Sequence, residues 1–292
     1  MLYEHYDWPK PITFYPDQGQ KSYRLKRLRF HLRSLLYKRV IRQFVYFVQQ
    51  NPQIQPLLAH KPSYYYPLVH RFLDKRFHAE QRLKYMCQSL QFLPQKLREL
   101  GLPPLWENPI SFGEIVPNLA LRLNINEFQA MEGFWALELY DISIEQCVYV
   151  LTFANVDDAF LIGSIQGPNF DGSKELVKKL TKACHGLRPA YLLIESMKAL
   201  TMTLNVKQLL GIPHQYQNKS RVIQSKRYVV NYDEMFKESA GVKHKYWELP
   251  TYFNIKDIET IASNKRSMYR KRYAMLTDIQ QRMMMLMNKQ AQ

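Results

Sequence analysis

Hydrophobic residues recur every three to four positions through the first hundred residues, which is the spacing of one helical face. Within residues 21–50 one such face carries leucines, and the opposite face carries basic and polar residues. The leucines are Leu25, Leu28, Leu32, Leu35 and Leu36, and opposite them lie Arg24, Arg27, His31, Ser34 and Lys38. The pattern predicts an amphipathic helix, or two in series, ending at Asn51-Pro52. Further helices are expected over residues 66–76 and 79–100, the second with a break at Pro94.

From residue 115 to 165 the spacing changes to alternation, which is typical of β-strands. The segments that carry it are LALRLNI (119–125), FWALELYDI (134–142), QCVYVLTFANV (146–156) and DDAFLIGSIQG (157–167). Residues 155–158 between the last two are a good hairpin turn. Four strands in series predict an antiparallel meander.

After Pro168 a loop leads into a helix over residues 174–186, which Asp171 or Ser173 can cap. Pro189 opens a second helix, and residues 207–213 fit a buried strand. The tail from Ile255 is helical and basic. The expected fold class is therefore α+β: a helical N-terminal region on a mainly antiparallel central sheet flanked by helices.

Charge divides the chain more sharply than hydrophobicity does. The 292 residues include 41 Lys or Arg against 25 Asp or Glu, a formal net charge of +16. Residues 21–100 hold 17 basic and 3 acidic side chains, whereas residues 101–200 hold 7 and 12. We expect a surface arm (1–20), a basic helical region (21–104), an α+β core (105–254) and a basic C-terminal helix (255–292). The excess indicates an anionic partner: nucleic acid, an acidic lipid surface or a phosphorylated ligand.

The cysteines and the lengths of the apolar segments indicate the cellular location of the protein. Cys87, Cys147 and Cys184 are far apart and form no CxxC or Cys/His cluster, so neither a zinc site nor a disulfide framework is expected. The N-terminus lacks the pattern of a secretory signal, and no apolar run approaches about 20 residues. We therefore expect a cytoplasmic protein, with peripheral contact to the inner membrane as a further hypothesis.

Three blocks of sequence carry a family resemblance. They are LIGSIQGP (161–168), LTKACHGLRP (180–189) and NKRSMYRKRYAML (264–276), and RLKRLRFHLRSLLY (24–37) adds to them. In this order they resemble the VirK/YbjX family of Gram-negative bacteria, over about residues 21–285. The resemblance implies a cytoplasmic protein associated with virulence, envelope stress and survival of cationic antimicrobial peptides. It supplies no known active site.

The stretch 160–218 is one candidate ligand site. Its order of strand, loop, helix, strand and short helix is similar to the acyl-CoA-binding half of the N-acetyltransferase-like fold, where a helix N-terminus holds the cofactor pyrophosphate. Gln166, Gly167, Ser173 and Lys174 are the candidate ligand-binding residues, and acyl-CoA is the candidate cofactor. The usual Q/R-x-x-G-x-G/A spacing is absent, however, and Pro168 removes a donor. An ordinary capped helix packed on a sheet is the alternative.

The block His185-Gly186-Leu187-Arg188-Pro189 is a second candidate. His185 could act as a general base near neutral pH, and Arg188 could bind a phosphate or carboxylate. Glu195, on the following helix, could orient either, so His185 and Glu195 are the catalytic candidates. The alternative is a helix–Gly–helix corner, with Gly186 at C′ and Pro189 starting the next helix.

The basic flanks suggest contact with an anionic surface. Arg24, Arg27 and Lys38 could lie on an acidic leaflet beside the leucine face, or the helix could simply pack its leucines on the core. On the C-terminal helix Arg266 and Arg270 share a face. No recognisable nucleic-acid-binding motif is present, so nucleic acid is not the expected partner. The hypotheses are an acyl-CoA-dependent transferase at the inner membrane surface, or a non-catalytic binding module for anionic lipid or RNA.

Overall fold

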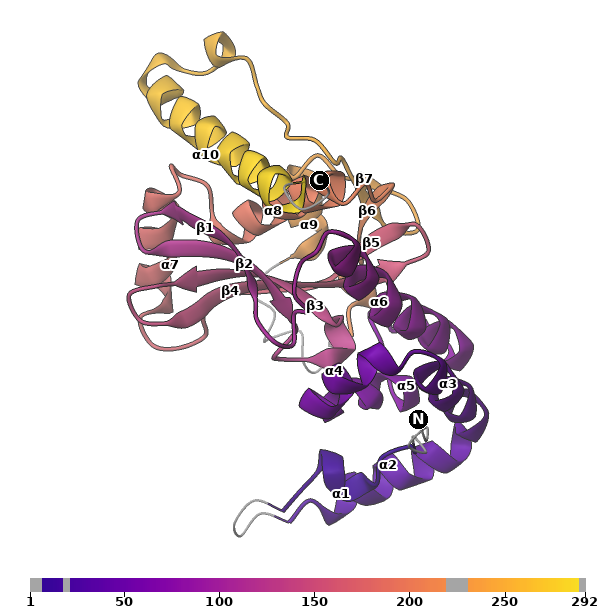
Figure 1. Ribbon diagram of the computed structural model, residues 1–292. Helices are drawn as coiled ribbons and strands as arrows, with labels where there is room; N and C mark the ends of the chain where they lie inside the picture. The colour runs from indigo at the N-terminus through magenta and orange to yellow at the C-terminus, as the bar shows by residue number, and fades with distance from the viewer. Residues whose placement is uncertain (1–6, 18–21, 219–230, 289–292) are drawn as a thin grey trace.

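A mostly antiparallel sheet of eight strands organises the protein (Figure 1). The computed structural model describes residues 7–17, 22–218 and 231–288. The strand order is β1-β2-β3-β4-β5-β6-β8-β7, and only β5 and β6 are parallel. The strands are β1 (Ile110–Val116), β2 (Leu119–Ile125), β3 (Trp135–Asp141), β4 (Gln146–Val156), β5 (Ala159–Gln166), β6 (Gln208–Gly211), β7 (Val242–Lys243) and β8 (Trp247–Leu249). The expected α+β class is confirmed.

The first five strands form the predicted meander, which β1 extends by one strand. The hairpin between β4 and β5 turns on Asp157 and Asp158, with Asp157 in the left-handed region at φ 53°. In that hairpin Thr152 pairs with Ser164 but Phe153 pairs with Ile162, so Gly163 is an extra residue in β5. Such a β-bulge bends its strand and increases the local twist.

The later helices pack on the sheet and on each other. Helix α8 (Pro189–Thr203) lies across β3 to β6, and α10 (Ser263–Asn288) packs against α8 and β1. Helix α7 (Ser173–Ala183) precedes α8, and α9 (Tyr232–Glu238) packs on β8. The predicted cap of α7 is wrong: the N-cap is Gly172 at φ 90°, and no side chain caps the helix.

The described part of the first hundred residues is mainly helical, as the pattern predicts. The series 21–50 is two helices, α2 (Arg24–Leu36) and α3 (Lys38–Gln50), and α6 (Ala79–Glu99) continues through Pro94 without a break. The helix expected over 66–76 is wrong, because α5 ends at Val69. The remaining helices are α1 (Pro11–Phe14), α4 (Gln55–His60) and α5 (Tyr66–Val69), with short 3₁₀ turns η1 (Pro52–Ile54), η2 (Pro62–Tyr65), η3 (Ala130–Glu132), η4 (His214–Tyr216) and η6 (Ile258–Thr260). Residues 1–6 and 18–20 of the predicted surface arm lie outside the described residues.

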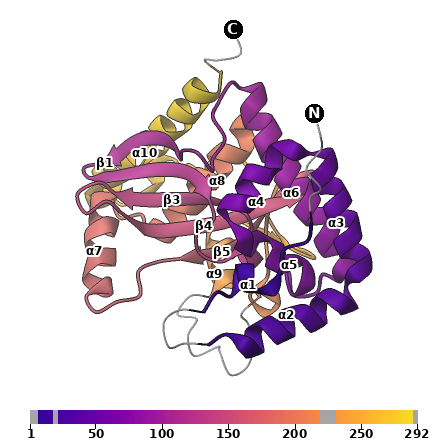
Figure 2. The same cartoon turned by 60° about the horizontal axis from the view of Figure 1, so that its bottom comes forward.

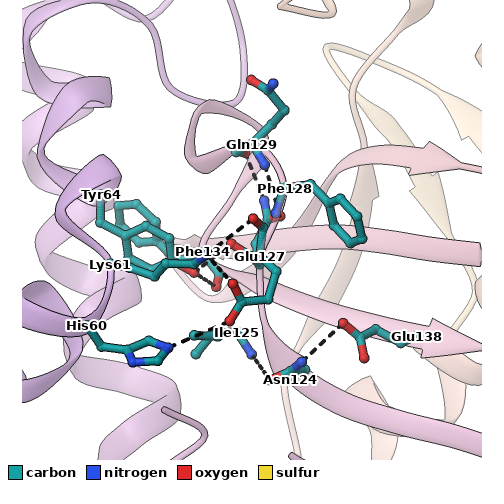
Figure 3. Close-up of polar contacts among 11 residues, drawn as sticks. His60, Lys61, Tyr64, Asn124, Ile125, Glu127, Phe128, Gln129, Phe134 and Glu138 are labelled. Carbon is teal, nitrogen blue, oxygen red and sulfur yellow. Dashed lines mark hydrogen bonds and ion pairs between the residues drawn. The ribbon is translucent and has the colours of Figure 1, made fainter. Parts of the chain in front are cut away.

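A polar and aromatic junction joins the N-terminal helices to the sheet (Figure 3). The ammonium of Lys61 pairs with the carboxylate of Glu127, which follows β2. The hydroxyl of buried Tyr64 donates to the carbonyl oxygens of Phe134 (2.7 Å) and Asn126 (3.2 Å), and its ring stacks on Phe134. These contacts place α4 and η2 against the loop between β2 and β3. Helix α6 packs against β4, and Trp135 of the neighbouring β3 donates a hydrogen bond from its indole nitrogen to the carbonyl of Ser89 in α6.

Candidate functional site

A basic pocket lies where α7, the corner before α8 and the first turns of α10 meet. It has a volume of about 890 Å³ and is lined by Val177, Lys178, Thr181, Lys182, His185, Gly186, Arg188, Asn264, Ser267, Met268 and Lys271. The lining residues come from segments that are about 80 residues apart in the sequence. The structure thus brings two of the predicted site residues, His185 and Arg188, into one pocket.

The corner is built from consecutive left-handed residues. Helix α7 ends with Cys184 as its C-cap, so His185 (φ 53°), and not Gly186, occupies C′. Gly186 follows at φ 76°, and a Cβ there would come within 2.9 Å of Met268 and Arg272. Glycine suits this conformation, and a side chain here would displace the ends of the Met268 and Arg272 side chains. Pro189 is the first residue of α8, as predicted.

Helix α10 holds the corner in place. The guanidinium of Arg272 donates from Nε (3.1 Å) and Nη2 (3.0 Å) to the carbonyl oxygen of His185, and it lies over the ring of Tyr269. Because the last carbonyls of a helix lack partners within the helix, a cation here also balances the negative end of α7. The shape of the pocket therefore depends on α10.

The electrostatics of the pocket favour an anion. None of its lining residues is acidic, and Lys178, Lys182 and Lys271 make no ion pair within the described residues. Arg188 is held by stacking on Tyr191 and by Glu238, whose carboxylate lies 3.7 Å away. Burial, and then the charges of Lys271 and Arg272, lower the pKa of His185 below 6.5. His185 is therefore mostly uncharged at neutral pH.

Glu195 makes its polar contact with a residue other than His185 and Arg188. Its carboxylate accepts a hydrogen bond from Lys198 Nζ at 2.7 Å, and the fully buried Lys198 also donates to the carbonyl of Ser239 at 3.0 Å. Burial raises the pKa of Glu195. The structure thus gives Glu195 a partner within α8, and no contact with His185 or Arg188 is found.

Gln166 ends β5, Gly167 follows it, and both lie outside the pocket. The amide of Gln166 donates to the buried carboxylate of Glu132 and to Ser164 Oγ (3.1 Å). Gly167 faces the ring of Tyr149. Ser173 and Lys174, at the start of α7, do not line the pocket either. The predicted ligand-binding residues therefore lie in three places: the end of β5, the start of α7 and the pocket, which Arg188 lines.

The space beside the end of β5 is filled by a tyrosine. Pairing with β6 stops at Ile162 and Gly211, and β5 continues alone on that side to Gln166. There the hydroxyl of Tyr232 accepts a hydrogen bond from the amide of Ile165 (2.9 Å) and donates to its carbonyl oxygen (3.0 Å). The Phe236 ring packs against Gly211. Side chains of the protein thus occupy the space beside the end of β5.

Helix α2 presents its leucines to solvent, contrary to the alternative that packs them on the core. Leu25 is 70% exposed and Leu36 is 75% exposed, and Leu28, Leu32 and Leu35 are also exposed. The buried residue is Phe30, which stacks on Trp8 and lies on the opposite side of the helix. Part of the predicted polar face packs inward: Arg27 donates hydrogen bonds to Asp17 and to the carbonyl of Tyr15, and Ser34 accepts one from Trp8.

The other predicted basic residues differ in their surroundings. Arg24 on α2 and Lys38 on α3 are exposed. Arg266 pairs with Glu259 and donates hydrogen bonds to the carbonyl oxygens of Ile261 and Glu259. These contacts join the first turn of α10 to the segment that precedes it. Arg270 is exposed on α10. Sequence reasoning did not select Lys182 and Lys271 as site residues. The spacing of Lys178 and Lys182 indicates a basic face on α7, but only the tertiary contact with α10 makes a pocket of it.

Among the described residues, no helix is long and apolar enough to cross a membrane, and no group of three His, Cys, Asp or Glu side chains is placed to hold a metal ion. All three thiols have pKa values raised to about 12 by burial, which leaves them protonated at neutral pH.

The fold and the site define an α+β protein with an exposed amphipathic helix and a basic pocket. A family model described as "Protein of unknown function (DUF535)" matches residues 19–285, and the chain belongs to this family. "Membrane protein LapB" of Mannheimia haemolytica is 60% identical over 215 residues, 74% of this chain and 95% of the relative. An uncharacterized protein of Haemophilus influenzae is 51% identical over 274 residues, 94% and 93% of the two chains.

"Uncharacterized protein YbjX" of Escherichia coli is 25% identical over 282 residues, 88% of this chain and 82% of the relative. These similarities confirm the resemblance to the VirK/YbjX family. No solved structure matches the chain.

Proposed function

We propose that the protein binds the anionic inner face of the cytoplasmic membrane peripherally, through the exposed leucines of α2. The observation that carries the proposal is the outward orientation of Leu25, Leu28, Leu32, Leu35 and Leu36 on a single helix. Contiguous apolar patches on the surface of a globular protein are characteristic of interaction sites. Burying one leucine contributes about 1.5–3 kcal/mol, so several together are enough to hold a protein at an interface.

Charge supports lipid as the occupant. Arg24 and Arg29 are exposed and border the leucine face on its two sides, given about 3.6 residues per turn. The sequence contains no acidic residue between Asp17 and Asp74. A second copy of the chain packed on this face would bring like charges together, whereas an acidic leaflet attracts each of them by about 1 kcal/mol. Anionic lipid therefore fits this face better than a symmetric dimer does.

The name of one relative supports the same setting. One relative is named a membrane protein, and the resemblance to the VirK/YbjX family implies virulence, envelope stress and survival of antimicrobial peptides. We include these as the proposed biological context of a cytoplasmic protein that works at the inner membrane.

Vesicle sedimentation tests the proposal. Wild-type protein should bind phosphatidylglycerol vesicles, and binding should fall with salt and be weak on phosphatidylcholine. The double substitution Leu28→Gln/Leu32→Gln should weaken binding about tenfold or more. The matched control is Ile142→Gln/Ile144→Gln, which changes two exposed apolar residues in the turn after β3. This control should bind as wild type does.

Three results would contradict the proposal: equal binding to neutral vesicles, an unchanged α2 double variant, or self-association through α2 without vesicle binding. If single-stranded RNA retains the protein in competition with vesicles, the partner is RNA and not lipid.

An acyl-CoA-dependent transferase is the second candidate, and the topology favours it. Parallel β5 and β6 joined through α7 and α8, a bulge at Gly163, and β8 inserted between β6 and β7 resemble the acyl-CoA half of an N-acetyltransferase-like fold. The hydroxyl of Tyr232 is hydrogen-bonded to the backbone amide and carbonyl of Ile165, the groups to which an extended ligand would bond. Titration with acetyl-CoA tests this candidate. No binding at about 1 mM to wild type or to Tyr232→Ala would exclude it.

A further inference from the structure

We infer that the basic pocket between α7, the His185 corner and α10 is a binding site for an organic phosphate, that is, a phosphate monoester with an apolar or partly apolar substituent. Lys178 and Lys182 reach it from α7, Arg188 from the corner and Lys271 from α10. Ser267, Asn264 and Thr181 add hydrogen-bonding groups to the same walls. No wall carries a carboxylate.

The three lysines of the pocket are available to a ligand. Lys178, Lys182 and Lys271 are exposed and make no ion pair within the described residues, unlike Lys84 and Lys207, which pair with Asp157 and Asp158. Like charges gathered around one cavity repel each other, and a bound dianion would relieve that repulsion. Phosphate oxygens can accept several charge-assisted hydrogen bonds from lysine and arginine.

The size and walls of the pocket favour an ester over the free ion. A volume of about 890 Å³ is within the range of small-molecule sites and far exceeds that of one phosphate. Val177 and the thioether of Met268 form apolar parts of the wall, beside Gly186. The phosphate would lie among the lysines, and the substituent would pack on Val177 and Met268.

The backbone of the corner is held before a ligand binds, because Arg272 fixes the carbonyl of His185 by two hydrogen bonds. This backbone therefore needs little ordering when a ligand binds. The exposed side chains of Lys178, Lys182 and Lys271 would be ordered by the ligand.

The pocket is independent of the membrane face. In Figure 1, α10 lies at the top of the molecule and α2 at its bottom, and in Figure 2, α7 lies at the left edge and α2 at the lower right. A protein attached to a leaflet through α2 would hold the pocket away from that leaflet. A soluble phosphate ester thus fits the pocket better than a lipid headgroup of the same membrane.

Calorimetric titration of the full-length protein with phenyl phosphate and with inorganic phosphate, at constant ionic strength, tests the inference. Phenyl phosphate should bind with a Kd of about 1 mM or lower and more tightly than inorganic phosphate. Lys182→Ala and Lys271→Ala should each weaken binding about fivefold or more. The control is Lys174→Ala, which removes one charge from the same end of the molecule but outside the pocket, and it should stay within about twofold of wild type.

Vesicles that contain phosphatidic acid, a phosphate monoester on a lipid, form the second arm. If the pocket variants lose binding to these vesicles and not to phosphatidylglycerol, the site is supported with lipid as its source. The inference is overturned if wild type binds neither probe at about 10 mM phosphate ester. It is also overturned if Lys174→Ala loses as much affinity as Lys271→Ala, since the site would then be the start of α7.

Discussion

The hydroxyl of Tyr232 makes two hydrogen bonds to a single residue, accepting from the amide of Ile165 at 2.9 Å and donating to its carbonyl oxygen at 3.0 Å. One side chain therefore satisfies both backbone groups that β5 would otherwise share with a neighbouring strand. The chain thereby ends its parallel pairing without leaving buried backbone groups unpaired.

Replacing Tyr232 by phenylalanine removes both hydrogen bonds and keeps the ring. The buried amide and carbonyl of Ile165 would lack their partner, so the free energy of unfolding should fall by about 1–3 kcal/mol in urea denaturation. Tyr252→Phe, at an exposed tyrosine, is the control and should change stability by less than about 0.5 kcal/mol. Equal effects would mean that Tyr232 does not support β5.

The orientation of α2 predicts an unusual contrast between its apolar residues. Phe30→Ala should lower the free energy of unfolding by about 3–5 kcal/mol, because Phe30 is 1% exposed and packs on Trp8. Leu32→Ala, two residues later, should change it by less than about 0.5 kcal/mol. Thermal or urea unfolding measures both. A large loss from Leu32→Ala would show that the leucines pack on the protein itself.

The β-bulge at Gly163 tolerates no side chain. A Cβ would lie 1.8 Å from the carbonyl oxygen of Glu132, so Gly163→Ala should cost more than about 4 kcal/mol or prevent soluble expression. Gly172→Ala is a suitable comparison, because nothing lies within 4 Å of its Cβ and only the positive φ is strained. It should cost about 1 kcal/mol, measured by chemical unfolding.

His185 should titrate below pH 6.5. Burial and the charges of Lys271 and Arg272 lower its pKa, and Lys178, Lys182 and Arg188 also line its pocket. Because the folded state resists protonation more than the unfolded state does, stability from this group is full above pH 6.5. It is lost as the pH falls through the lowered pKa. NMR titration should show a higher pKa in Lys271→Ala. A pKa unchanged in that variant would contradict the assigned charge effect.

Much of the sheet could be predicted from sequence because large apolar residues alternate with smaller or polar ones along β2, even though both faces of this strand are buried. Leu119, Leu121 and Leu123 alternate along β2, and Asp157-Asp158 forms the predicted turn. Helical periodicity is less informative, since it separates two faces of α2 without saying which one meets the protein. Phe30, a large aromatic residue within the polar face, was the one signal that this face packs inward.

The candidate site could be predicted only where its residues are neighbours in sequence. His185 and Arg188 belong to one corner and were selected together, and Pro189 starts α8 as expected. Lys271 reaches the same pocket from α10, and no spacing in the sequence relates it to Lys182. Glu195 was assigned to this site by proximity along the chain. The helix instead turns its carboxylate toward Lys198, where burial demands a counter-charge.

The position of α10 has a consequence for how the chain folds during synthesis. Met275, Ile279, Met283 and Met287 are buried where this helix packs against α8 and β1. While these residues are still inside the ribosome, the nascent chain exposes the apolar surface that α10 covers in the folded protein. Completion of the core therefore waits for the segment up to Met287. Until then, a chaperone that shields α8 would keep the unfinished protein from aggregating.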